Sequence, residues 1–209
     1  MRYSSGWLFS AIALAALLAG CAEKGPIFLN VGYQPAEVRS GTQKKIIAGV
    51  SPLKDSRGRA ASVLGKRKTS SGIENDLMAQ VAVSDLVASG LKNALKARGV
   101  MVKDAAAWDM TEGNIPAGNF DILLGGEITT LWLESTSAPF KTSLKGSVQL
   151  KIVAADASGK KIIRTLNVNS KVEQDVLYSR EKLESVLSEA LSSALDQIFA
   201  DSVLEIKLQ

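Results

Sequence analysis

The sequence predicts an α+β fold in which a mostly antiparallel sheet carries two amphipathic helices packed on one face. Three observations predict it. Residues 144–154 alternate between apolar and polar side chains, as in a strand with one buried and one solvated face. Residues 84–99 and 180–200 repeat apolar side chains at the spacing of amphipathic helices. The expected order is strand, helix, strand, a three-stranded meander and a closing helix, which places both helices on one side of the sheet.

The first strand of the body is expected within residues 44–53, where Pro52 ends it at an edge or in a turn. Asp55 then lies two residues before Arg57 in a turn. Two interpretations stay open for this pair. It forms either a charge-assisted hydrogen bond that shapes the loop, or two solvated charges that contribute little.

Three consecutive basic residues, Lys66, Arg67 and Lys68, form the most positive stretch of the chain. We expect a solvated loop here, mobile over residues 66–72, and the alternative is a segment that docks on phosphate head groups. Residues 77–83 fit either a short strand or the first turn of the helix that follows.

The first helix is expected to begin with Ser84 as its N-cap and with Asp85 in its first turn, where a negative charge suits the helix dipole. Its apolar face spans residues 86–95, and Gly99 suits the position just after its last turn. A strand is expected to follow at residues 100–102 after a very short connection.

Residues 104–119 are expected to form a loop, in which Trp108 is either a plug over the core or an exposed contact. The next strand is predicted at residues 120–133, with Gly125 and Gly126 in its middle. A glycine pair inside a strand indicates a bulge or the close approach of another backbone.

Strand 144–154 is expected to turn at residues 156–159 and to return as a strand at residues 162–172. The closing helix is capped by Ser179 and carries a continuous apolar stripe that includes Leu187. Because its other face is acidic and lacks the lysine and arginine expected near anionic lipid, we assign the stripe to the core rather than to a membrane surface.

The amino-terminal residues 1–20 are expected to be an export signal, because their apolar run is too short to span a bilayer. The run ends in Leu18, Ala19, Gly20 and Cys21, and Cys21 is the only cysteine in 209 residues. This combination resembles the bacterial lipobox. The resemblance implies that the Cys21 thiol receives a diacylglyceryl group, that the chain is cut before it, and that the new amino terminus is acylated. The alternatives are an ordinary cleaved signal with a chance cysteine, and an uncleaved apolar anchor.

Residues 21–43 are expected to form the lipidated amino terminus and a tether, followed by a single α+β domain at residues 44–209. Within the tether, residues 27–33 alternate as a short strand does. A short strand and an unstructured leash both stay open for this segment.

Composition restricts what the exported body can do. Loss of residues 1–20 removes Arg2 and lowers the net charge from +4 to +3. With a single cysteine, no disulfide forms within the chain, so stability must come from packing. Because the protein is exported, we expect no nucleic-acid partner, and the mild basic excess is better explained by attraction to anionic lipid or glycan.

We expect no enzymatic activity, no cofactor and no metal site. The chain contains no histidine, which excludes Ser-His-Asp, Cys-His and histidine-rich metal sites. Ser51 and Lys54 have the spacing of a Ser-Lys pair, but Pro52 lies between them and breaks the helix that such a pair needs. Carboxylates are present, but nothing in the sequence sets two of them at a catalytic distance; they are Asp109, Glu112, Asp121, Glu127 and Glu134.

Several short motifs resemble the YajG-like family of bacterial lipoproteins. They are the exported start, residues 46–50 running into 55–57, the Val-Leu-Gly at 63–65, the helix end at 95–100, the meander and the final helix. The resemblance implies an envelope lipoprotein of a bacterium with two membranes, without an assigned activity. The architecture is also similar to that of auxiliary lipoproteins of envelope transport machines, but fold alone does not confer function.

Localisation follows from the residue after the lipidated cysteine. In the sorting rule for such lipoproteins, aspartate at that position retains the protein in the inner membrane, whereas this chain has Ala22. We therefore expect the outer membrane, with membrane lipid bound through acylated Cys21 and the body facing the periplasm. Two functions stay open: a structural or interaction module for an envelope protein partner, and a lipid- or glycan-binding accessory with a pocket between sheet and helices.

Overall fold

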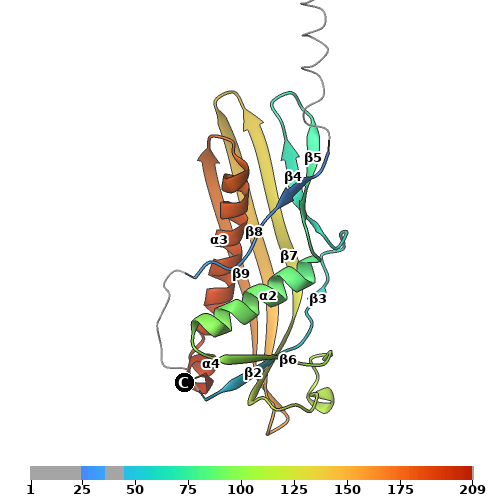
Figure 1. Cartoon of the computed structure of the whole chain (residues 1–209), viewed down its shortest axis with the longest axis vertical. Coiled ribbons are helices and arrows are strands. Elements are labelled where there is room, and N and C mark those ends of the chain that lie inside the picture. Colours follow the sequence, from blue (N-terminus) through green and yellow to red (C-terminus); the bar gives the residue numbers. More distant parts are fainter. Residues whose placement is uncertain (1–24, 36–44, 209) are drawn as a thin grey trace, which may run out of the picture.

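The computed structural model describes residues 25–35 and 45–208. The predicted signal peptide and Cys21 lie outside these residues. The strands and helices, labelled in Figure 1, are β1 (Ile27–Leu29), β2 (Ile47–Val50), β3 (Lys54–Asp55), β4 (Val63–Lys68), β5 (Glu74–Ala79), α2 (Val83–Ala97), β6 (Met101–Asp104), η1 (Glu112–Asn114), β7 (Ile122–Ala138), β8 (Lys141–Asp156), β9 (Lys161–Val176), α3 (Arg180–Phe199) and α4 (Ser202–Lys207).

The sheet is organised around β7, which runs through most of its length. One edge of β7 pairs with β8 along nearly the whole strand, and β8 pairs in turn with β9. The other edge pairs successively with β2, β3 and β4. The sheet therefore continues from this edge of β7 as two separate groups of strands. One group is β4, β5 and β1 at one end of the molecule, and the other is β2 with β6 at the opposite end (Figure 1).

The α+β class is confirmed, but the expected mostly antiparallel sheet is wrong, because the sheet is mixed. β2, β3 and β4 all run parallel to β7, β6 runs parallel to β2, and β1 runs parallel to β5. Antiparallel pairing is found between β4 and β5, β7 and β8, and β8 and β9. Side-chain alternation reports which face of a strand is buried and carries no information about the direction of its neighbour, so the sequence could not reveal the parallel pairs.

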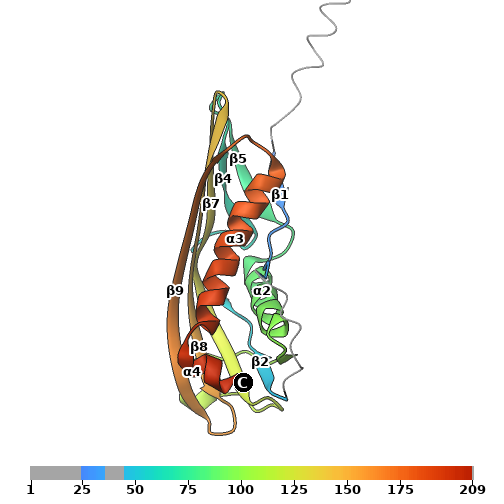
Figure 2. The same ribbon diagram turned by 90° about the vertical axis from the view of Figure 1, so that its left-hand side faces the viewer.

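Helices α2 and α3 lie on the same face of the sheet, as predicted (Figure 2). Leu187 and the other large apolar residues of the α3 stripe are buried in the core between helices and sheet. The Ser179 side chain caps α3 by accepting a hydrogen bond from the Lys182 backbone N–H at 3.3 Å. The assignment of this stripe to the core is therefore confirmed.

The start of α2 differs from the expectation. The helix begins at Val83, with Ala82 rather than Ser84 at the N-cap position and no side-chain cap. The Val83 N–H instead donates to the backbone oxygen of Ala61 at 2.8 Å. A backbone oxygen supplied by a distant loop replaces the side-chain cap that local sequence suggested. Gly99, at φ +79°, ends the helix as predicted.

The basic run is not a solvated loop: residues 63–68 form β4, and only residues 69–73 turn. Arg67 points into the protein, is buried, and lies 3.7 Å from the ring centroid of Tyr178. Lys66 and Lys68 are exposed on the other face. An arginine can bury its stem and stack on an aromatic ring, which a count of charges does not reveal.

The charge-assisted interpretation of Asp55 and Arg57 is confirmed. The Arg57 side chain is 2% exposed and binds both carboxylate oxygens of Asp55 at 2.8 Å. Its Nη1 also donates to the Val63 backbone oxygen at 2.6 Å. The pair therefore ties the turn after β3 to the start of β4.

The glycine pair in β7 marks two close approaches. A Cβ on Gly126 would lie 2.5 Å from the Lys151 backbone oxygen, and one on Gly125 would lie 2.8 Å from the Trp108 ring. Trp108 is buried, so its side chain covers the core and is not an exposed contact. With Ile115, Phe120, Leu123, Val153 and Ala155 it forms a second, smaller core on the side of the sheet away from the helices.

Two short elements complete the fold. Residues 27–29 form β1, so the strand alternative holds for this part of residues 27–33, whereas residues 30–33 lie outside the strand. α4, which the sequence did not predict, starts after Asp201, whose side chain accepts hydrogen bonds from the Val203 and Leu204 N–H groups. A helix of six residues is too short to show a periodic pattern.

Candidate interaction surface

The segment after β1 is held along α3 by a regular set of hydrogen bonds. The N–H of Asn30 donates to a Glu184 carboxylate oxygen at 2.9 Å. Two residues later, Gly32 N–H donates to Ser188 Oγ at 3.3 Å, and after two more Gln34 N–H donates to Ser192 Oγ at 2.8 Å. Every second residue of the extended segment therefore meets every fourth residue of the helix.

This spacing follows from the dimensions of the two backbones. Two residues of extended chain advance about 6.6 Å, and four residues of helix advance about 6.0 Å. A polar row at four-residue spacing on a helix can therefore bind alternate N–H groups of an extended chain. The alternate side chains, Leu29, Val31 and Tyr33, turn toward the core.

A cluster of charged and polar side chains lies at the end of this contact nearest the C-terminus of α3. Asp196 accepts hydrogen bonds from the Tyr33 hydroxyl and from Arg98, each at 2.8 Å. The Arg98 guanidinium also lies 4.4 Å from the Phe199 ring centroid. Burial raises the pKa of the Tyr33 hydroxyl, and Asp196 adds to the increase while Arg98 opposes it. The cluster joins the amino-terminal segment, α2 and α3.

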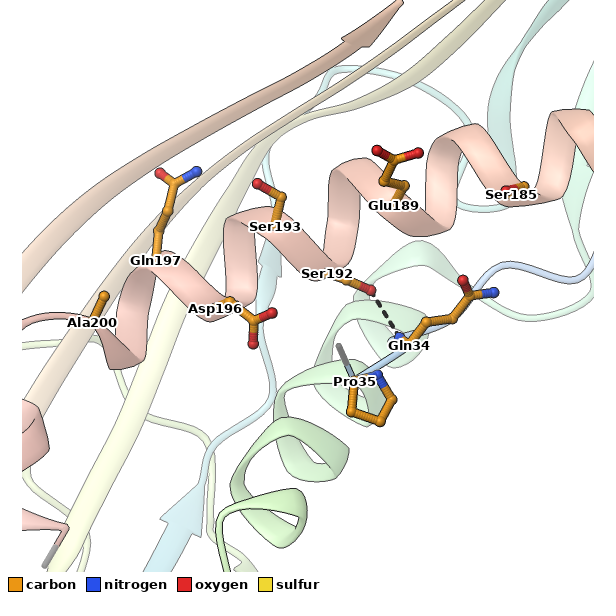
Figure 3. A pocket seen from close by; sticks show the side chains of 9 residues that line it. All are labelled: Gln34, Pro35, Ser185, Glu189, Ser192, Ser193, Asp196, Gln197 and Ala200. Carbon is orange, nitrogen blue, oxygen red and sulfur yellow. Dashed lines mark hydrogen bonds between the residues drawn. The ribbon is translucent and has the colours of Figure 1, made fainter. Parts of the chain in front are cut away.

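Beside this contact lies a groove of about 720 Å³, which we call the α3 groove (Figure 3). From α3, the side chains of Glu189, Ser193 and Gln197 project on one side, whereas Ser192 points toward Gln34. The full lining is Gln34, Pro35, Ser185, Glu189, Ser192, Ser193, Asp196, Gln197 and Ala200. Seven of these nine residues carry a polar side-chain group.

Several of the polar groups in the groove are already tied to the adjacent strand. Glu189 accepts from the Gln174 amide at 3.1 Å, and the Gln197 amide donates to the Asn169 backbone oxygen at 3.2 Å. These bonds fix the polar ridge of α3 against β9. The groove and β9 therefore form one continuous surface.

β9 is an edge strand. Within the residues that the structure describes, it pairs only with β8, over nearly all of its 16 residues. The Asn169 backbone oxygen accepts from Gln197 of α3, and the oxygen of Gln149, its partner in β8, accepts from Thr129 of β7, so both oxygens face away from the β8–β9 interface. In an antiparallel pair, the backbone groups of alternate residues point the same way. The outward-facing backbone groups near this point therefore belong to Thr165, Asn167, Asn169, Lys171 and Glu173.

A second hollow, of about 370 Å³, lies between the segment after β1 and the first half of α2. Its lining includes Val81, Asp85, Ser89 and Asn93. Val81 is exposed. This hollow is smaller than the α3 groove and does not border the open edge of the sheet.

The carboxylates that the sequence singled out are each engaged locally. Asp109 accepts from Thr111 and Asn114, which holds its pKa below the ordinary value. The other four serve as follows: Glu112 accepts from the Ile162 N–H, Asp121 from the Ile47 N–H, Glu134 from Trp132 Nε1, and Glu127 pairs with Lys54 at 3.8 Å. These contacts are structural in character.

Ser51 and Lys54 do not form a pair. Ser51 is buried and donates to the Ala106 backbone oxygen at 3.0 Å, while Lys54 contacts Glu127. In the described part of the chain, no three acidic or cysteine side chains are grouped as a metal site would require. The absence of enzymatic activity stays a prediction.

The residues of α3 that bind the amino-terminal segment were not predicted from the sequence. Ser188 and Ser192 lie on the polar side of the helix, opposite the apolar stripe, yet both are buried. The signal was present as a polar row at four-residue spacing, from Glu184 to Asp196, beside the apolar stripe. Such a row indicates a buried polar contact when it borders the core.

Comparison with known proteins supports the prediction that this protein is a lipoprotein. A family model described as "Uncharacterized lipoprotein" matches residues 124–209, which is 86 of the 209 residues. The match supports lipid anchoring at a bacterial cell envelope. No curated protein matches the chain at a significant level. No helix among the described residues is long and apolar enough to cross a membrane.

Solved structures with a similar arrangement have little sequence identity to this chain. A Xanthomonas campestris protein is 12% identical, with 88% of this chain and 96% of that chain covered and a TM-score of 0.49. The PelC dodecamer of Paraburkholderia phytofirmans is 12% identical, with 86% and 95% covered and a TM-score of 0.42. A minor lipoprotein of Acinetobacter baumannii is 13% identical, with 76% and 94% covered and a TM-score of 0.39. At this level of similarity, none of them indicates what this chain binds.

Proposed function

We propose that the protein is a YajG-like lipoprotein of the outer membrane, anchored through acylated Cys21, whose body faces the periplasm and acts as a non-enzymatic interaction module. Its partner is another envelope protein. The observation that carries this function is the open edge of β9, whose outward-facing backbone groups lie beside the polar α3 groove. An unpaired strand edge binds an extended segment through main-chain hydrogen bonds, and an adjacent groove adds side-chain specificity.

The anchor is tested by replacing the thiol. Cys21→Ser should abolish fatty-acid incorporation and release the protein from the membrane fraction, because several acyl chains on one residue are needed for stable anchoring. Metabolic labelling and cell fractionation measure both effects. A Cys21→Ser variant that is labelled and membrane-bound like the parent would refute the anchor.

The interaction surface is tested at the edge of β9. A photo-crosslinking residue at Thr165 should yield a discrete adduct in cells, and the same residue at Lys145, in the middle of the sheet, should not. Asn167→Pro removes an outward-facing N–H without touching the β8 ladder, so it should abolish the adduct while the fold persists. Asn167→Ala keeps the N–H and should retain the adduct. Equal adducts in both Asn167 variants would contradict strand addition.

A second candidate is glycan binding in the α3 groove. It is favoured by the lining, in which Pro35 and Ala200 are the apolar residues and the others carry hydroxyl, amide or carboxylate groups. Such groups match sugar hydroxyls. Titration with soluble peptidoglycan fragments should then show saturable binding that Ser193→Trp removes by filling the groove. Absence of binding to the parent protein would exclude this candidate.

A further inference from the structure

The folded body starts very close to the predicted lipid. Gly25 is held by the Asn75 side chain, whose amide donates to the Gly25 oxygen at 2.8 Å. Three residues lie between Cys21 and Gly25, and the four residue steps of a fully extended chain span at most about 14 Å. The polar head-group layer of one leaflet is about 5–8 Å thick. An acylated Cys21 therefore leaves little chain between the bilayer surface and the body.

Gly25 lies near one end of the elongated molecule. Asn75 pairs with Arg67, and Arg67 pairs with Ser135, so these residues mark one level across β5, β4 and β7. Ala138, the last residue of β7, is three residues beyond Ser135, which corresponds to about 10 Å. The turn between β7 and β8 therefore extends about 10 Å beyond the level of Gly25. This is most of the about 14 Å that the chain from Cys21 to Gly25 can span. Figure 1 shows this turn at the top of the molecule, opposite the C-terminus.

Among the described residues, the two large apolar side chains with the highest exposed fractions lie at this end, which we call the proximal tip, defined by residues 138–141 and 177–178. Phe140, in the turn between β7 and β8, is 96% exposed. Leu177, in the loop between β9 and α3, is 76% exposed. Thr142 pairs with Val176, so the turn and the loop lie next to each other.

Neither side chain is explained by packing within the body. Phe140 has φ +68°, a left-handed conformation that is unusual for a bulky residue, and its ring gains almost no burial. Tyr178 is held by Arg67 at 3.7 Å, which fixes the loop that exposes Leu177. Exposed aromatic and leucine side chains on a fixed tip are typical of residues that enter a membrane interface.

We propose that the proximal tip is a membrane-contact site that inserts Phe140 and Leu177 into the surface of the phospholipid bilayer carrying the lipid anchor. The occupant is the bilayer because the anchor brings this end, and no other, within reach of lipid. The charges at the tip are mixed, since Lys141 pairs with Asp175 at 2.9 Å, so the apolar side chains make the contact. This inference rests on the anchor in the proposed function and is independent of the β9 edge.

The opposite end supplies a matched control. Ile206 and Val203 on α4 are also exposed, with Ile206 at 72%, but they lie at the end far from Gly25 (Figure 1). Exposed apolar residues alone do not predict membrane contact. Proximity to the anchor distinguishes the two ends.

The test uses the acylated full chain in vesicles of phosphatidylethanolamine with a minor share of phosphatidylglycerol. Because Cys21 is the only cysteine and its thiol is consumed by the lipid, an introduced cysteine is the single site for a nitroxide label. Ala138→Cys places the label at the proximal tip, and Ser158→Cys places it in the exposed turn at the opposite end. Collision with an aqueous nickel chelate should be several-fold lower at position 138 than at position 158.

Substitution of the two apolar residues identifies the cause. Phe140→Ser with Leu177→Ser should restore nickel access at position 138, whereas Val203→Ser with Ile206→Ser should leave the protection unchanged. Equal access at positions 138 and 158 in vesicle-bound protein would overturn the tip contact while leaving the anchor intact. Protection that survives Phe140→Ser with Leu177→Ser would overturn the role of these residues. Failure of the parent to float with vesicles would overturn the anchor itself, and the tip contact with it.

Discussion

Gly65 provides a stringent test of how β4 is joined to the centre of the sheet. A Cβ added to Gly65 would lie 1.9 Å from the Leu133 backbone oxygen, and 2.8 Å and 2.9 Å from the carbonyl carbon and nitrogen of the same residue. All three contacts are with backbone, so no side-chain rotation relieves them. Gly65→Ala must therefore push β4 away from β7, where the two strands pair from Gly65 to Lys68.

The expected cost follows from this geometry. Overpacking a well-packed site costs about 1–3 kcal/mol, and contact with a backbone in the middle of a sheet belongs at the upper end. For a domain of this size, 1 kcal/mol corresponds to about 2–4 °C in melting temperature, so we expect a loss of about 6–12 °C. Burial of Arg67 should weaken as β4 moves, because Arg67 lies two residues further along the same strand.

The assay is thermal and urea unfolding followed by circular dichroism. Gly113→Ala is the matched control, since a Cβ at Gly113 meets no atom within 4 Å, and it should change stability by less than about 0.5 kcal/mol. A Gly65→Ala protein that melts within about 2 °C of the parent would refute the close approach of β4 and β7.

Two further predictions concern the core and the buried ion pair. Leu187→Ala should cost about 2–5 kcal/mol, because Leu187 is fully buried in α3, and Leu187→Asp should unfold the body; an unchanged melting temperature would contradict both. Asp55→Asn should cost about 3 kcal/mol by leaving the Arg57 guanidinium buried without its carboxylate. Hydrogen bonds from Arg57 hold the pKa of Asp55 below 3.8, so this carboxylate stabilises the folded state above pH 3.8, and the contribution is lost as the pH falls through the lowered folded-state pKa. Urea titrations at several pH values should therefore show a smaller acid-dependent loss of stability in Asp55→Asn than in the parent.

The sequence predicted those elements whose pattern is local. The alternation in β8 and the apolar stripe of α3 identify a buried face directly, and Ser179 and Gly99 mark helix ends through their own backbone chemistry. The start of α2 was missed because its first N–H is bound by Ala61, a residue from a distant loop. Strand direction was missed for the same reason, because parallel pairing with β7 is a relation between segments and not a property of either one.

The candidate surface was less predictable than the fold. Cys21 lies outside the described residues, so the strongest motif in the sequence remains a prediction. The sequence places Ser188 and Ser192 on the side of α3 opposite the apolar stripe, and in the structure their hydroxyl oxygens accept from the backbone N–H groups of residues 32 and 34. An extended segment more than 150 residues away in sequence supplies those partners. Helical periodicity describes the helix and cannot identify the strand or segment that covers it.

On the outer face of the sheet, charged side chains of opposite sign alternate from strand to strand. A row of alternating charges crosses five strands, because Lys66 pairs with Asp76 and with Glu134, Glu134 with Lys145, and Lys145 with Glu173. Opposite charges facing each other across strands stabilise a sheet. This part of the face presents solvated charges of alternating sign rather than an apolar patch, which leaves the edge of β9 as the more favourable place for a protein partner.

The two proposed contacts together determine how a partner meets the protein. In the proposed membrane contact, the carboxyl end of β9 lies next to lipid, because Val176 pairs with Thr142 beside the tip. The 16 residues of β9 extend about 50 Å from that end. A strand added to this edge therefore runs away from the membrane rather than along it. Thr165 lies 11 residues, or about 36 Å, from Val176. A crosslink at Asp175 without one at Thr165 would therefore indicate a partner confined to the membrane, and crosslinks at both positions would indicate a partner with a periplasmic segment that follows β9.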